Sequence, residues 1–73
     1  MASWSKSVYS SRVTTVAWNE DTRMIEVTWA KGGKVSAYGP ASEEVALNLA
    51  NAASVGIMIN QEIIPNYPHR YIS

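Results

Sequence analysis

The fold is decided by residues 24–38, which read MIEVTWAKGGKVSAY. Apolar and polar side chains alternate through the first half of this stretch, which is the pattern of a half-buried β-strand. The apolar side chains on one side of Met24–Lys31 are Ile25, Val27 and Trp29. Gly32-Gly33 is a strong signal for a hairpin, because glycine adopts the left-handed backbone that a tight turn needs. Lys34–Tyr38 then forms the next strand.

A further strand precedes this hairpin. Arg12–Asn19 is rich in β-branched and aromatic residues, which favour strands. Period-2 alternation places Thr14, Val16 and Trp18 on one face. Residues 19–22, Asn-Glu-Asp-Thr, supply the turn to the hairpin. Three strands in direct succession predict an antiparallel meander.

One main helix follows the sheet. Gly39-Pro40 ends the third strand, and Ser42 is a good N-cap. Glu43 and Glu44 fall in the first turn, where carboxylates interact favourably with the helix dipole. Apolar side chains recur at helical spacing at Val45, Leu49, Ala52 and Ala53. Gly56 is expected to end the helix.

The last residues, 54–73, suit more than one structure. The apolar runs Ile57-Met58-Ile59 and Ile63-Ile64 fit either a short helix or a strand, and two prolines favour irregular backbone. We therefore predict an α+β fold: a three-stranded antiparallel β-meander packed against one main α-helix, with an irregular or short-helical C-terminal segment. The serine-rich residues 1–11 are predicted to be a flexible N-terminal segment, and residues 12–73 a single domain.

Composition disfavours several classes of function. The chain has no Cys and one His, so we expect no metal and no cofactor. Six basic residues balance six acidic ones, and zero net charge disfavours a general nucleic-acid binder. No serine lies in a Gly-x-Ser-x-Gly context, so we predict no enzyme. The alternative from the enzyme class is a minimal hydrolase using His69, which unchanged activity in His69→Ala would exclude. No apolar run is long enough for a membrane span or a signal peptide, and we expect a cytoplasmic protein.

Aromatic and basic side chains gather at both ends of the chain. The candidate binding residues are Trp4, Lys6, Val8, Tyr9 and Arg12 at the N-terminus, and Arg70 and Tyr71 at the C-terminus. Trp, Tyr and Arg are typical of protein interfaces, although stacking residues beside cations also suit single-stranded RNA. Neutral net charge favours a protein partner. The N-terminal segment either folds back, with Trp4 or Tyr9 on the sheet, or becomes ordered on a partner.

Several short motifs follow one another along the chain: Ser10-Ser11-x-Val13, Val16-Ala17-Trp18-Asn19, Ile25-Glu26-Val27-Thr28-Trp29, Gly33-x-Val35, Ala53-Ser54-x-Gly56, Asn60-Gln61-x-Ile63 and Tyr67-Pro68-x-Arg70. In this succession the chain resembles the KTSC domain, a small module named for its occurrence at the C-terminus of certain lysyl-tRNA synthetases. The resemblance implies a fold for residues 12–73 more strongly than any activity. It implies that the Ala-Ser-x-Gly and Asn-x-x-Ile motifs belong to the structural scaffold of the domain.

The chain is also similar to small phage-encoded transcription regulators that bind host RNA polymerase. That resemblance implies a non-enzymatic monomer in the cytoplasm of an infected host cell. It would dock on the β′ N-terminal region near the RNA exit channel, inhibit promoter initiation and promote antitermination. It leaves room for an indirect or weak RNA contact, and the alternative is a small RNA-binding module of the KTSC type. Deletion of residues 1–11 is then expected to spare folding and abolish polymerase binding.

Overall fold

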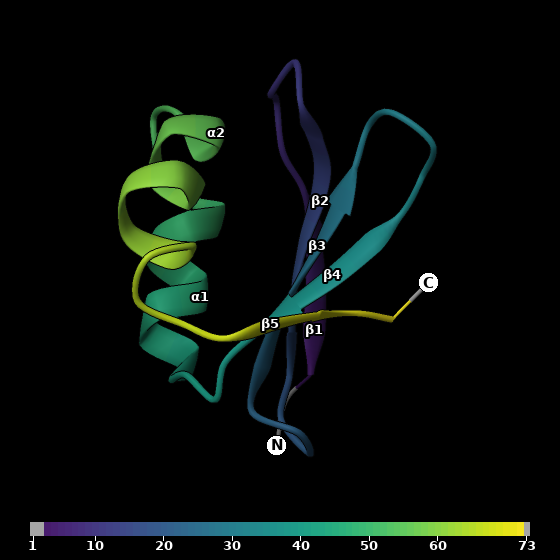
Figure 1. The fold of residues 1–73 in the computed structure, drawn as a ribbon. Coiled ribbons are helices and arrows are strands. Elements are labelled where there is room, and N and C mark those ends of the chain that lie inside the picture. The colour runs from purple at the N-terminus through teal and green to yellow at the C-terminus, as the bar shows by residue number, and fades with distance from the viewer. Residues whose placement is uncertain (1–2, 73) are drawn as a thin grey trace.

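Five antiparallel strands form one sheet, and the helices cover one of its faces (Figure 1). The structure is a computed structural model that describes residues 3–72. Neighbouring strands follow chain order: β1 (Trp4–Ser7), β2 (Val13–Asn19), β3 (Met24–Trp29), β4 (Val35–Tyr38) and β5 (His69–Tyr71). The predicted α+β class is confirmed, and the predicted meander corresponds to β2–β4. The prediction of three strands was wrong, because the sheet has one more strand at each edge.

The buried face of β2 differs from the predicted one at its first residues. Val13, Val16 and Trp18 are buried, whereas Thr14 is exposed. The register explains this difference, since Val13 pairs with Trp29 while Thr15 pairs with Thr28. Thr14 is the extra residue of a β-bulge, and a bulge shifts the alternation of side chains by one position.

Helix α1 (Glu43–Ala50) begins where the sequence predicts. The Val45 N–H donates a hydrogen bond to Ser42 Oγ at 3.4 Å, which caps the helix. The buried Leu49 belongs to a core that also contains residues of β2, β3 and β4. The helix ends at Ala50, and beyond it the Ala52 N–H donates to the Leu49 carbonyl three residues back at 3.2 Å, while Asn51 Nδ2 donates to the Leu47 carbonyl at 3.0 Å.

Gly56 therefore does not end the main helix. It lies inside a second helix, α2 (Val55–Met58), which continues directly into the π-helix η1 (Ile59–Ile63). Val55, Ile59 and Ile63 recur every four residues along these two elements and are all buried. Helical spacing thus gives this run one apolar face, and the short-helical alternative is the correct one. No helix in residues 3–72 has the length and hydropathy needed to cross a membrane.

The chain leaves the sheet at Gly39, which lies close to the β2–β3 turn. Its φ angle is +154°, and a Cβ at this position would lie 2.8 Å from the Arg23 carbonyl oxygen. Only glycine fits this backbone without displacing the β2–β3 turn. The Gly39 N–H donates to the Pro68 carbonyl at 3.0 Å, which holds the start of β5 beside β4.

Candidate functional site

Two of the predicted contact residues, Trp4 and Lys6, hold β1 to the main helix. Trp4 Nε1 donates a hydrogen bond to Glu43 Oε2 at 2.9 Å, and the partly buried indole packs against the core. Lys6 Nζ donates to Asn51 Oδ1 at 2.6 Å. Glu43 is the first residue of α1 and Asn51 its C-cap, so β1 contacts both ends of the helix.

This arrangement corrects the predicted boundary at residue 11. In the structure Trp4–Ser7 form an edge strand paired with β2, whereas residues 1–2 lie outside the described part of the chain. Of the two alternatives for the N-terminal segment, folding back onto the sheet holds for Trp4. Deletion of residues 1–11 would remove a strand of the sheet, so we now expect it to impair folding as well as binding.

Residues 8–12 form a loop between β1 and β2, referred to below as the N-terminal loop. Val8 packs against the core, and its N–H donates to the Thr14 carbonyl at 3.0 Å. The Arg12 N–H donates to Ser10 Oγ at 3.2 Å, which stabilises the turn. Tyr9 is 103% exposed, so its side chain contributes almost nothing to the core. Of the predicted N-terminal contact residues, Tyr9 and Arg12 are therefore exposed and available to a partner, and Lys6 is also exposed although its ammonium group donates to Asn51.

The N-terminal loop faces the turn between α1 and α2 across a groove with two adjoining hollows. The first, of about 250 Å³, is lined by Tyr9, Ser10, Ser11, Arg12, Ala53, Ser54, Val55, Gly56, Ile57 and Asn60. The second, of about 290 Å³, is lined by Lys6, Ser7, Val8, Tyr9, Ala50, Asn51, Ala52, Ala53 and Val55. Tyr9 lines both hollows, and we call the pair the loop groove. Gly56 lies close to the N-terminal loop, since a Cβ there would be 3.7 Å from both Arg12 Cδ and Ser10 Oγ.

The loop groove brings together three motifs that are distant in sequence. Ser10-Ser11 comes from the N-terminal loop, Ala53-Ser54-x-Gly56 from the helix turn, and Asn60 from η1. Sequence reasoning assigned the last two to scaffold and did not predict that they line a surface hollow. The one available signal was that all three belong to the KTSC resemblance.

The charges around the loop groove have one sign. Among the residues that line its two hollows, the charged ones are Lys6 and Arg12, and none is acidic. Hydroxyl and amide groups make up most of the remaining polar lining. The groove can therefore accept anionic and hydrogen-bonding groups.

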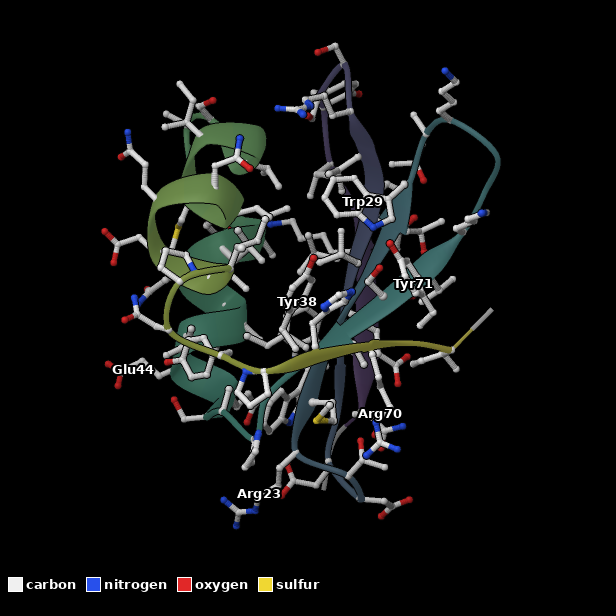
Figure 2. The ribbon with its side chains drawn as sticks, in the orientation of Figure 1. Arg23, Trp29, Tyr38, Glu44, Arg70 and Tyr71 are labelled. Atoms are coloured by element: carbon white, nitrogen blue, oxygen red, sulfur yellow. The ribbon has the colours of Figure 1, made fainter. Side chains whose placement is uncertain are left out.

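The C-terminal pair, Arg70 and Tyr71, does not join this site. Both residues lie in β5, at the opposite edge of the sheet from β1. They also project to different sides of their strand (Figure 2), as consecutive strand residues do. The structure thus separates the predicted contact residues into two surfaces.

The β5 surface carries a row of aromatic rings. Tyr38 stacks on His69 with ring centroids 5.3 Å apart, and His69 meets Tyr71 edge-on at 5.1 Å. Burial raises the pKa of Tyr38, and the nearby Tyr71 raises it further, while a hydrogen bond with Ser36 has the opposite effect. Both aromatic contacts of His69 are with tyrosine rings, so packing in the aromatic row accounts for the presence of this histidine. Within residues 3–72 no three His, Cys, Asp or Glu side chains are grouped to hold a metal ion.

The chain is similar to known proteins both in sequence and in fold. The KTSC domain matches residues 9–67. The fold is similar to the crystal structure of a KTSC domain protein from Yersinia pestis, with 26% sequence identity and a TM-score of 0.84. That similarity covers 99% of this chain and 100% of the other. A comparison with curated proteins finds no match. These findings concern the KTSC domain alone, and binding to RNA polymerase stays a prediction. The predicted family is confirmed, and the chain belongs to the KTSC domain family.

Proposed function

We propose that this KTSC domain is a non-enzymatic transcription regulator that binds host RNA polymerase through its N-terminal loop. The partner is the β′ N-terminal region near the RNA exit channel, and the protein acts in the cytoplasm of an infected cell. The choice of partner rests on the sequence resemblance to phage regulators. The choice of surface rests on the fold, and the observation that carries it is the fully exposed Tyr9.

An exposed tyrosine beside a groove suits a protein interface. Tyr and Arg are enriched among the residues that dominate binding energy, and Tyr has few rotatable bonds to immobilise. Ile57 lines the same hollow as Tyr9 and is 56% exposed, so apolar surface is available on both elements. Neither side chain is needed to fill the core, and each can gain stabilisation when a partner covers it.

A protein of this size would regulate by occupying a surface. Bound near the exit channel, it competes for the surface that an initiation factor needs, which inhibits promoter initiation. It also obstructs the place where a terminator hairpin forms, which promotes antitermination. Neither effect requires a chemical step.

Recovery of polymerase from host lysate tests the proposal. Tagged wild-type protein is expected to recover the polymerase subunits with and without nuclease, and to bind a purified β′ N-terminal fragment. Tyr9→Ala is expected to weaken that binding by about 30-fold or more, which corresponds to a hot spot of about 2 kcal/mol. Tyr71→Ala is the matched control, because Tyr71 is 68% exposed at the opposite edge of the sheet. Unchanged affinity in Tyr9→Ala would exclude the N-terminal loop as the contact.

The aromatic row at β5 supports a second candidate function, a small RNA-binding module of the KTSC type. The exposed ring of Tyr71, with His69 beside it, can stack on an unpaired base. Arg70 lies on the other side of the strand (Figure 2) and adds a positive charge at the same edge of the sheet. This function predicts that Tyr71→Ala, and not Tyr9→Ala, abolishes binding. It also predicts that nuclease removes any polymerase recovered from lysate. Zero net charge makes it the weaker candidate.

A further inference from the structure

We infer that the loop groove binds an acidic segment of the partner protein, with one apolar side chain held between Tyr9 and Ile57. This inference rests on the proposed function in one respect, that the partner is a protein. It adds the chemistry of the bound segment, which the sequence resemblance does not supply.

Charge complementarity is the first argument. Arg12 lines one hollow and Lys6 the other, and no carboxylate lines either hollow. Glu62 is the acidic residue nearest in sequence to the lining, two positions after Asn60, and it does not line the hollow. Lys6 donates to the neutral amide of Asn51, which leaves its charge uncompensated by that contact. Two positive charges spaced along a groove match carboxylates spaced along a peptide.

The size and lining of the hollows indicate single side chains. Their volumes, about 250 and 290 Å³, fall below the usual range for sites that bind drug-sized ligands. Ser10, Ser11 and Ser54 offer hydroxyl groups that can donate to a carboxylate beside the Arg12 guanidinium. The exposed ring of Tyr9 and the exposed methyl groups of Ile57 line the same hollow, and they suit an apolar side chain next to that carboxylate.

The edge of the sheet favours a segment in extended conformation. β1 pairs with β2 alone, so its outer edge has no neighbouring strand among residues 3–72. Lys6 and Ser7 of this strand line the second hollow. An extended segment in the groove can therefore continue along the free backbone groups of β1, which is a common mode of peptide recognition.

The small number of cations argues against a nucleic acid in this groove. Two cations neutralise about two phosphates, which supplies little of the salt-dependent affinity that nucleic-acid binding needs. A peptide gains in addition from burial of Tyr9 and Ile57, and this gain does not depend on charge.

Titration of the isotope-labelled protein, followed by NMR, tests the inference. The probe is a capped peptide with four acidic residues around one leucine. It is expected to shift the amide signals of residues 6–12 and 53–60. Lys6→Gln and Arg12→Gln are each expected to weaken its binding by about fivefold, the upper range for one exposed ion pair. Lys31→Gln and Lys34→Gln, at the exposed β3–β4 hairpin, are matched controls that should leave binding unchanged.

Two further probes decide whether charge and chemistry are assigned correctly. A peptide with lysine in place of the acidic residues should not bind, and an oligouridylate of about eight nucleotides should not shift the groove signals. Equal binding of the lysine peptide, groove shifts caused by the oligonucleotide, or no binding of the acidic peptide would each overturn the inference.

The same variants separate this inference from the proposed function. If wild-type protein binds polymerase and Lys6→Gln/Arg12→Gln binds it equally well, the acidic segment is refuted while the polymerase proposal stands. If the acidic peptide binds in the groove but polymerase is not recovered, the groove chemistry is supported and polymerase is the wrong partner.

Discussion

The hydrogen bond between Trp4 and Glu43 should make a measurable contribution to folding. It joins the edge strand β1 to the first turn of α1, with 2.9 Å between Nε1 and Oε2. Hydrogen bonds to charged groups contribute roughly 1.5–3 kcal/mol, and partial exposure of both side chains lowers this to about 1 kcal/mol. In a domain of this size, the loss of about 1 kcal/mol lowers the melting temperature by about 4–8 °C.

A double-mutant cycle isolates this contribution. Trp4→Phe keeps a ring on the core but removes the donor, and Glu43→Ala removes the acceptor. Glu44→Ala is the matched control, because Glu44 lies in the same first turn and points away from the sheet (Figure 2). Each Glu variant loses a similar favourable interaction with the helix dipole, so their difference reports the bond to Trp4. Urea and thermal unfolding followed by far-UV circular dichroism give the four free energies of unfolding.

The expected coupling between the two substitutions is about 1 kcal/mol. Additive effects, with a coupling below about 0.3 kcal/mol, would contradict the proposed role of this bond. Such a result would mean that the bond to Glu43 does not stabilise the contact between β1 and α1, which would then rest on the Lys6–Asn51 hydrogen bond and on packing of the indole.

Four further predictions concern stability. Gly39→Ala should lower the free energy of unfolding by about 2 kcal/mol or more, because its Cβ would lie 2.8 Å from the Arg23 carbonyl oxygen; an unchanged urea midpoint would contradict this. Ile63→Ala should cost about 2–5 kcal/mol, since Ile63 is fully buried, and a cost below about 1 kcal/mol would place it outside the core. Tyr9→Ala should change stability by less than about 0.5 kcal/mol, so a larger change would show that its ring packs on the fold. The pKa of Tyr38 is raised above its ordinary value of 10.0, so the folded state holds this proton more tightly than the unfolded state. The stability that this raised pKa contributes is full below pH 10.0 and decreases as the pH rises toward the folded-state pKa. Over that range the free energy of unfolding of Tyr38→Phe, measured in urea, should therefore fall less than that of the wild-type protein. An equal fall in both proteins would exclude the role of Tyr38.

Elements with a strong local pattern were predictable. Ile25 and Val27 alternate with polar residues, Gly32-Gly33 marks the hairpin, and Ser42 caps the helix within one turn. Each of these signals acts between residues close in the chain, so the sequence carries it directly. The family was also predictable, because its motifs extend over most of the chain.

The candidate site was predictable only in part. Tyr9 and Arg12 were recognised because their residue types favour interfaces and no strand pattern accounts for them. Trp4 and Lys6 were expected to contact a partner, yet their contacts with Glu43 and Asn51 are made within the fold. The two kinds of residue look alike in sequence, and contacts across some forty positions distinguish them.

By itself, the sequence determined the α+β class, the central meander, the start of the main helix and the family. Tertiary structure alone decided that Trp4–Ser7 and His69–Tyr71 become edge strands, and that the N-terminal loop meets the α1–α2 turn to form a groove. The physical reason is the range of the interactions. β1 and β5 are short and lack a neighbouring hairpin signal such as the Gly32-Gly33 turn that precedes β4, so their pattern is too weak to be recognised. They form because a strand supplied by another part of the chain provides their hydrogen bonds.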